Sequence, residues 1–338
     1  MLGAILCCMR PPLRKTPTTL KMARALLTKR QGNRLWNRVF GRYDATSLIC
    51  RETRAEARAR KASGRPPRLH HLDVHLTDHC NLNCRSCEHY SSISKPVFTD
   101  LSTFEADLTR LAGLFEGIDQ VYLLGGEPLL HPQVEEFVRV ARKHLPGTRI
   151  CLMTNGVLVP KMGDSFWGAL HETETILLCD QYPGVADVEA ITALGAEHGV
   201  VVEFVQATEQ FFRAPIDLSG TCDPQESFVR CTGVSNCATI KDGRMYPCAH
   251  IAYADILRER FDIEQLHPGP EDSISVHGDA TGDDIVDFLM SPVPWCANCD
   301  YPALEYFEWG RTSRSIDEWV RVDGSGVGCA ARGERGRS

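Results

Sequence analysis

The sequence predicts an α/β protein built from parallel βα units. From residue 69 onward, short apolar runs alternate with segments of helical composition, which is typical of a parallel sheet whose strands are joined by helices. A hydrophobic content of 43% and a charged content of 24% are those of an ordinary globular protein, and no run of about 18 apolar residues predicts a membrane span. We expect strands at 69–76, 121–124, 149–153, 175–179 and 200–205, and helices at 101–116, 133–144 and 185–198.

The helical segments have recognisable ends. In the helix at 101–116, Ser102 is the expected N-cap and Glu105 lies three residues on, as in a capping box. Residues 22–40 and 48–62 have helical composition, and a short helix is expected at 315–320. The run Gly64-Arg-Pro-Pro is a break, so the main domain is expected to start after it.

Three cysteines lie within eight residues, in the spacing C-x3-C-x2-C, at Cys80, Cys84 and Cys87. Soft thiolates gathered in this way bind zinc or an iron–sulfur cluster. Three ligands instead of four leave a position open for a substrate or cofactor. Since 69–76 alternates as a half-buried strand does, the cysteine loop should follow the C-terminal end of that strand, which is the functional face of a β/α barrel.

Two further motifs fall where predicted strands end. Gly125 and Gly126 follow the second strand, where missing side chains allow a small molecule to approach the backbone, and Glu127 supplies an acceptor. Thr154, Asn155 and Gly156 end the third strand, where an ordinary turn is the alternative reading.

Together these motifs resemble the radical S-adenosylmethionine (SAM) superfamily. The resemblance implies a [4Fe–4S] cluster held by Cys80, Cys84 and Cys87, whose fourth iron chelates the amino and carboxylate groups of SAM. It further implies that Gly125, Gly126 and Glu127 contact the SAM amino group, that Thr154 and Asn155 contact SAM, and that the fold is a partial (β/α)6 TIM-like barrel. One position departs from the pattern, because Ser86 stands where an aromatic residue is common.

A second group of cysteines lies in the C-terminal half. Residues 237–248 predict a β-hairpin that turns at Asp242-Gly243, and a C-x2-C pair follows about fifty residues later. This pattern resembles the SPASM and shorter twitch modules of radical SAM enzymes, which implies one auxiliary [4Fe–4S] cluster, and a zinc ribbon is the alternative. The implied ligands are Cys248, Cys296 and Cys299, with either Cys231 or Cys237 as the fourth.

These patterns divide the chain into four parts. They are a basic extension at 1–68, a radical SAM core at 69–215, an auxiliary-cluster domain at 216–310, and a closing helix with a flexible tail at 311–338. The extension carries 17 Lys and Arg against 3 Asp and Glu, so it predicts either an anionic partner or an arm that folds against the acidic remainder. No nucleic-acid fold signature accompanies it. Met22 is an alternative start.

The resemblance implies reductive cleavage of SAM to a 5′-deoxyadenosyl radical that abstracts hydrogen from a substrate. We expect oxidation of a small molecule of the sugar or aminocyclitol kind, with maturation of a ribosomally made peptide as an alternative and a non-enzymatic zinc-binding interaction protein as another. A flavodoxin- or ferredoxin-type electron donor is expected. The 15 cysteines, odd in number and clustered, indicate metal sites in a reducing cytoplasm. No catalytic base is assigned.

Overall fold

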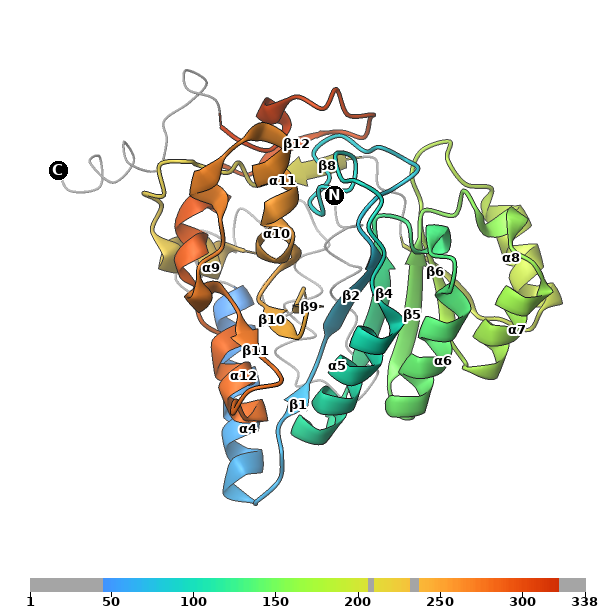
Figure 1. The fold of residues 1–338 in the computed structure, drawn as a ribbon, viewed down its shortest axis with the longest axis horizontal. Coiled ribbons are helices and arrows are strands. Elements are labelled where there is room, and N and C mark those ends of the chain that lie inside the picture. Colours follow the sequence, from blue (N-terminus) through green and yellow to red (C-terminus); the bar gives the residue numbers. More distant parts are fainter. Residues whose placement is uncertain (1–44, 206–209, 232–236, 322–338) are drawn as a thin grey trace, which may run out of the picture.

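A computed structural model describes residues 45–205, 210–231 and 237–321 of the chain. Its centre is an eight-stranded sheet in the order β11-β10-β9-β2-β4-β5-β6-β7 (Figure 1). The six strands from β9 to β7 are parallel, and β10 and β11 continue the sheet in antiparallel pairing. The strands are β2 Leu72–Thr77, β4 Gln120–Gly125, β5 Arg149–Thr154, β6 Ile176–Asp180, β7 Val202–Val205, β9 Thr239–Lys241, β10 Arg244–Tyr246 and β11 Ile274–Ser275.

This sheet confirms the predicted α/β class and its partial barrel. The sixth parallel strand is β9, which the sequence predicted only as one arm of a hairpin at 237–248. That hairpin is present, with Asp242 and Gly243 at its turn in left-handed conformations. The predicted boundary at 215–216 remains a prediction, because the sheet continues across it.

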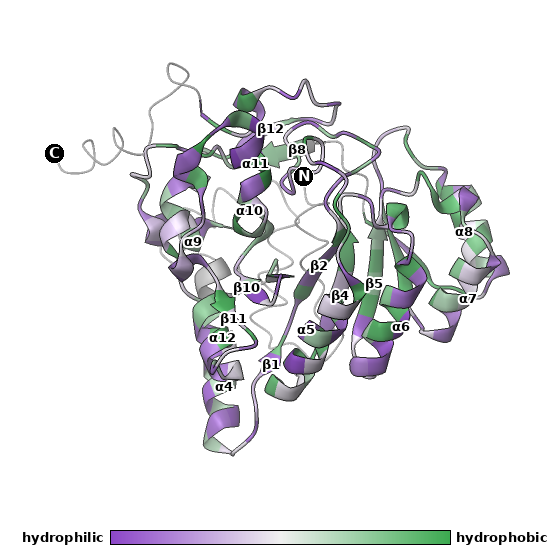
Figure 2. Cartoon of the chain, in the orientation of Figure 1, coloured by the Kyte–Doolittle hydropathy of each residue, from purple (hydrophilic) through white to green (hydrophobic). Residues whose placement is uncertain are grey.

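Helices follow the parallel strands and cover one face of the sheet. Alternate residues of β2, such as Val74 and Leu76, share one core with Leu108 and Phe137 of the covering helices. The strand β5 is largely hydrophobic and β2 is partly hydrophilic, whereas helices such as α6 combine hydrophobic and hydrophilic residues (Figure 2). This pairing of alternate strand residues with a helix stripe is the usual way a βα unit buries its apolar surface. The helices are α5 Leu101–Leu114, α6 Val134–His144, α7 Asp164–Glu172 and α8 Val188–Glu197, with 3-10 turns η1 Pro128–Leu130 and η2 Val159–Lys161.

Three local predictions were wrong in detail. The N-cap of α5 is Asp100, whose carboxylate accepts from Thr103 N at 2.9 Å, so Ser102 lies inside the helix. Asp and Ser are about equally good N-cap residues, and Asp100 lies directly before the first apolar residue, Leu101. The strand predicted at 69–76 is interrupted, since β1 (Arg68–Leu69) pairs with β3 (Gly117–Ile118). The closing helix expected at 315–320 is a single 3-10 turn, η7 Ile316–Glu318.

The C-terminal part packs a second core beside the sheet, around Trp295, Trp319 and Leu257. The strand β12 Glu305–Glu308 pairs with β8 Gln210–Arg213 apart from the main sheet. The remaining elements are α9 Pro224–Arg230, α10 Ala249–Ala252, α11 Ala254–Phe261, η3 Glu264–Leu266, η4 Pro270–Asp272, α12 Gly282–Leu289, η5 Pro294–Asn298 and η6 Tyr301–Ala303.

Part of the basic extension folds onto this region. The helix α4 Ala45–Ala62 lies beside α12 (Figure 1). Lys61 lies 3.3 Å from Asp283, and Arg54 lies 3.7 Å from Asp287. For residues 45–62 this agrees with the arm that folds against an acidic body, whereas the helix predicted at 22–40 falls outside the described residues.

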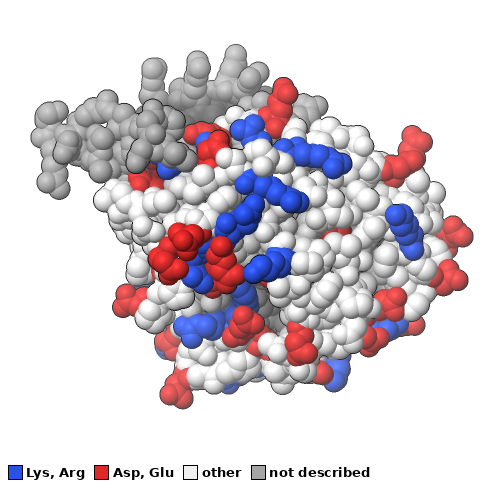
Figure 3. Space-filling model, turned by 45° about the horizontal axis from the view of Figure 1, so that its top comes forward, with Lys and Arg blue, Asp and Glu red and all other residues white. Residues whose placement is uncertain are grey.

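Acidic and basic side chains also lie close together on the face that Figure 3 turns forward. In the described ranges, no helix is both long enough and apolar enough to cross a membrane.

Candidate metal and cofactor site

The first cysteine group lies on the loop that leaves β2. Asn83, Ser86 and Tyr90 have positive φ angles of 57°, 51° and 56°, so this short loop bends sharply three times. Left-handed residues other than glycine are uncommon and cluster at functional sites. The pKa of Cys80 and of Cys84 is raised to about 12, mainly by burial and to a smaller extent by the neighbouring thiols. The three sulfurs are therefore close enough to affect each other electrostatically.

Gly125 and Gly126 press against the beginning of this loop. A Cβ atom added at Gly125, where φ is +137°, would lie 2.3 Å from Thr77 O, and one at Gly126 would lie 2.0 Å from His79 O. Gly126 N donates to Thr77 O at 2.8 Å, and Glu127 N donates to His79 O at 3.1 Å. Glycine is therefore required at both positions because the backbone of Thr77 and His79 lies too close for a side chain.

Glu127 ties the second motif to the third. Its side chain is fully buried, and its carboxylate accepts from Thr154 Oγ1 at 2.7 Å, Asn155 N at 2.9 Å and Leu129 N at 3.1 Å. Burial raises the pKa of Glu127 to about 7, against the opposing effect of these hydrogen bonds. Three donors already occupy this carboxylate, so it holds the ends of β4 and β5 together.

The side chain of Asn155 contacts the cysteine loop. Its Nδ2 donates to Asn81 Oδ1 at 2.7 Å and lies within hydrogen-bond reach of Cys80 Sγ at 3.6 Å. The three motifs that the sequence singled out therefore meet at the C-terminal ends of three neighbouring parallel strands.

Sequence reasoning missed the segment that covers the cysteine loop from the other side. Trp309 Nε1 donates to Cys84 Sγ at 3.3 Å, and Trp319 Nε1 donates to Cys87 O at 2.9 Å. More than 220 residues separate each pair, so no local pattern could have shown these contacts. Asp180, at the end of β6, was also missed, and burial raises its pKa to about 6. Its position at a strand end was the available signal.

The second cysteine group is assembled from separate elements. Cys231 caps α9, Cys248 follows β10, Cys296 lies in η5, and Cys299 caps η5. Burial raises the pKa of Cys299, and Cys231, Cys248 and Cys296 raise it further. Cys231 also has the largest effect of any cysteine on Cys248. The structure therefore brings Cys231 together with the three other predicted ligands.

The other predicted candidate, Cys237, lies two residues before β9, next to residues that the structure does not describe. Cys222, in the same half of the chain, is disulfide-bonded, so it is not a thiolate ligand in this structure. In the described ranges, no group of three or more His, Cys, Asp or Glu is arranged to hold a single metal ion.

Tyr90 lies between the two cysteine groups. Its side chain is fully buried, and its Oη lies 2.9 Å from His250 Nδ1. Burial raises its pKa well above the ordinary value, and Cys248, Cys299, Glu88 and Cys87 raise it further. Cysteines of both groups therefore raise the pKa of the same phenol.

On the sheet face opposite the covering helices, β2 carries a row of buried polar side chains. His75 is one of them, 2% exposed, with its ring stacked on Tyr253 at 3.8 Å and edge-on to His89 at 4.6 Å. Neither ring nitrogen of His75 has a hydrogen-bond partner among the described residues. Burial lowers its pKa well below the ordinary value. His89 Nδ1 lies 3.2 Å from Gly125 O, which links the polar side chains of β2 to the glycine motif.

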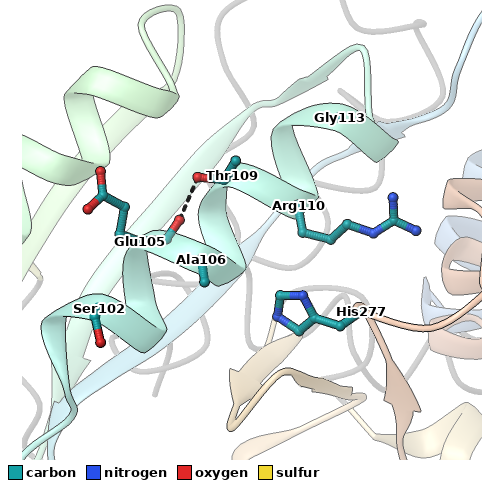
Figure 4. A pocket seen from close by; sticks show the side chains of 7 residues that line it. All are labelled: Ser102, Glu105, Ala106, Thr109, Arg110, Gly113 and His277. Carbon is teal, nitrogen blue, oxygen red and sulfur yellow. Dashed lines mark hydrogen bonds between the residues drawn. The ribbon is translucent and has the colours of Figure 1, made fainter.

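A separate hollow lies beside α5, and the side chains of Arg110 and His277 are part of its lining (Figure 4). None of the predicted site residues lines it. Its lining consists of Ser102, Glu105, Ala106, Thr109, Arg110, Gly113 and His277.

Comparison with protein families places residues 74–171 in the Radical SAM superfamily. A GTP 3′,8-cyclase of Alkaliphilus oremlandii is 33% identical over 101 residues, which are 29% of this chain and 31% of the relative. Molybdenum cofactor biosynthesis protein 1 of Mus musculus is 43% identical over 109 residues, which are 30% of this chain and 17% of the relative. The matched stretch thus spans less than a third of these curated relatives.

Solved structures show a weaker likeness. The crystal structure of BtrN in complex with AdoMet and 2-DOIA has a TM-score of 0.41 and 18% identity, and the match covers 68% of this chain and 92% of that one. SuiB of Streptococcus suis bound to SAM has a TM-score of 0.35 and 16% identity, with 45% of this chain and 37% of that chain covered.

Proposed function

Since residues 74–171 form a radical SAM domain, we propose that this chain is an enzyme that cleaves SAM at a [4Fe–4S] cluster bound by Cys80, Cys84 and Cys87. When bound and reduced, the cluster supplies one electron that splits SAM into methionine and a 5′-deoxyadenosyl radical, which abstracts hydrogen from a substrate. The observation that carries the proposal is the meeting of the cysteine loop, Gly125–Glu127 and Thr154–Asn155 at one edge of the sheet.

The donor set fits such a cluster. Three thiols lie on one loop, and two of their sulfurs are within reach of side-chain N–H donors, from Asn155 and from Trp309. N–H groups that point at sulfur are the usual surroundings of iron–sulfur ligands. Glu127 holds this arrangement together through Thr154 and Asn155. The SAM contacts proposed for Gly125, Gly126, Thr154 and Asn155 rest on the family resemblance.

We further propose that Cys231, Cys248, Cys296 and Cys299 hold an auxiliary [4Fe–4S] cluster. The effects of Cys231 on the pKa of Cys248 and Cys299 support its inclusion in this set, and Cys237 is the alternative fourth ligand. A zinc site on the same four sulfurs is the alternative, and the sulfide content separates the two.

The proposed reaction is the two-electron oxidation of a small polar alcohol, in which the 5′-deoxyadenosyl group would take the hydrogen atom and the auxiliary cluster would accept the second electron. In support, both ring nitrogens of the buried His75 lack a hydrogen-bond partner among the described residues, and its ring packs on His89, whose Nδ1 lies 3.2 Å from Gly125 O. Relatives named for a GTP cyclase make a nucleotide the second candidate substrate, and a ribosomally made peptide is the third. A flavodoxin- or ferredoxin-type protein is the proposed electron donor.

The test is iron and acid-labile sulfide per chain, measured on anaerobically reconstituted wild type and on the triple variant Cys80→Ala/Cys84→Ala/Cys87→Ala. We expect about eight irons in the wild type and about four in the variant. We also expect release of 5′-deoxyadenosine from SAM under dithionite only in the wild type. Zinc without sulfide in both proteins contradicts the enzyme function.

The substrate class is tested by the same release assay. Sugar and aminocyclitol alcohols, GTP and a peptide library are added in turn at equal concentration. A small polar alcohol that increases 5′-deoxyadenosine release and is recovered as a ketone supports the proposal. Stimulation by GTP or by a peptide alone would replace the small-molecule oxidation and leave the radical SAM activity in place.

A further inference from the structure

Residues 309–319, which we call the strap, lie across the cysteine loop as an added strand would. Arg85 N donates to Gly310 O at 2.8 Å, and Thr312 N donates to Asn83 O at 3.0 Å. Between them, Cys84 and Arg311 form an antiparallel bridge. The backbone of the loop is thus paired on its open side by a segment from the far end of the described chain.

Glu318 fastens the strap to the loop. Its side chain is 3% exposed, and its carboxylate accepts from Ser86 N at 3.1 Å on the loop. On the strap it accepts from Ser313 N and Thr312 Oγ1, both at 2.6 Å. A buried carboxylate that is satisfied from both sides joins the two segments more firmly than backbone pairing alone.

Two tryptophans of the strap donate to the loop, but to different acceptors. The indole N–H of Trp309 points at the sulfur of Cys84, whereas that of Trp319 points at the backbone oxygen of Cys87. The ring of Trp309 packs beside that of Tyr182, with 5.9 Å between the ring centroids and a tilt of 33°. An N–H donor stabilises negative charge on a ligand sulfur, and this stabilisation is larger in the reduced cluster than in the oxidised one.

We propose that the strap tunes and retains the cluster proposed for Cys80, Cys84 and Cys87. Trp309 is the positioning residue that raises its reduction potential through Cys84, and Glu318 keeps Trp309 in place. This inference rests on the proposed function, because it requires a cluster on that loop.

The first test compares Trp309→Phe with Trp319→Phe in the full chain after anaerobic reconstitution. Both variants lose an indole N–H and keep an aromatic ring, and they differ in the acceptor and in burial, since Trp319 is 3% exposed and Trp309 is half-buried. The midpoint potential is measured by reductive titration followed by EPR, on the signal that changes when SAM is added. We expect Trp309→Phe to shift the potential to lower values, and Trp319→Phe to shift it by less than half as much.

The result that overturns the inference is an equal potential in wild type and Trp309→Phe, or an equal shift in both variants. If the wild type itself contains no iron and sulfide, the proposed function fails, which is a separate outcome. If Trp309→Phe cannot be reconstituted, Glu318→Gln takes its place with the same expected direction, because the weakened strap withdraws the same donor.

A second measurement does not depend on the potential. Arg311 and Arg314 are exposed on the strap, so trypsin can cut there once the strap lifts from the loop. Coupling between two bound groups is reciprocal, so a cluster that the strap retains must in turn hold the strap down. We expect cleavage at these two arginines, identified by mass spectrometry, to be several-fold slower in reconstituted than in iron-free wild type. In Glu318→Gln this ratio should fall towards one, and a ratio of one in the wild type contradicts retention.

Discussion

The two cysteine groups of this protein reach their sites in opposite ways. The first, Cys80 to Cys87, is contained in eight residues of one loop. The second draws Cys231, Cys248, Cys296 and Cys299 from three separate regions of the chain. The first can be recognised from spacing alone because the chain length between ligands already limits their separation. The second depends on α9 packing against η5 and on the hairpin that ends at Cys248.

The comparison also shows that a local motif is completed by distant residues. The first loop is bounded by the ends of β4 and β5 on one side and by the strap on the other. The three proposed ligands are close together in the sequence, whereas the residues that surround them come from distant parts of the chain, as in the second group. Variants that affect one group and spare the other test this view.

The largest expected effect distinguishes the ligands of the second group. We expect Cys231→Ala to lose about half of the iron bound by the wild type, because it removes one of the four thiolates of the auxiliary cluster. Cys237→Ala is the matched control and should keep nearly all of it. Iron and sulfide analysis of both reconstituted variants decides between them, and the reverse result would assign the fourth ligand to Cys237.

A smaller effect should be confined to the first group. A methyl group at position 126 cannot be accommodated next to His79 O, so Gly126→Ala must displace the start of the cysteine loop. We expect a loss of about 2 kcal/mol or more in the free energy of unfolding, together with poor loading of the first cluster and normal loading of the second. Gly113→Ala in α5, where no atom lies within 4 Å of the added methyl, should leave both clusters loaded. Equal iron loss from both groups in Gly126→Ala would contradict a local effect.

His75 predicts a pH effect on the iron-free protein. Burial lowers its pKa in the folded state, so only the unfolded state takes up a proton as the pH falls through about 6.5. The contribution to stability is therefore complete above that pH and is lost below it. Between pH 7.5 and 5.5, the wild type should lose about 1 kcal/mol of unfolding free energy relative to His75→Phe. Urea unfolding at both pH values measures this difference, and parallel changes in the two proteins would refute it.

The smallest effect concerns Tyr90, which both groups share. Tyr90→Phe removes the hydrogen bond to His250 and leaves the packing of the ring, so we expect a loss of about 1 kcal/mol in unfolding free energy with both clusters retained. Tyr306→Phe is the control, since Tyr306 is 50% exposed and should change the stability by less than about 0.5 kcal/mol. Loss of either cluster in Tyr90→Phe would show that the phenol does more than connect the two groups.

Much of this architecture could be predicted from local pattern. The alternation of strands and helices, the hairpin turn at Asp242-Gly243, and the three motifs at strand ends depend on residues a few positions apart. Errors occurred where a neighbouring residue competed for the same role, as when Asp100 instead of Ser102 capped α5. Such competition is decided by small energy differences that composition does not resolve.

The sequence by itself determined the α/β class and the close spacing of Cys80, Cys84 and Cys87, because 3.6-residue and two-residue periodicities and short spacings are properties of the chain itself. Only the tertiary structure showed that Cys231 lies near Cys248 and Cys299, that β9 extends the parallel sheet, and that Trp309 reaches Cys84. Each of these contacts closes a long segment of chain. Closing long segments costs conformational entropy that depends only weakly on their length, so many distant pairings are nearly equal in cost, and the packing of the complete fold selects among them.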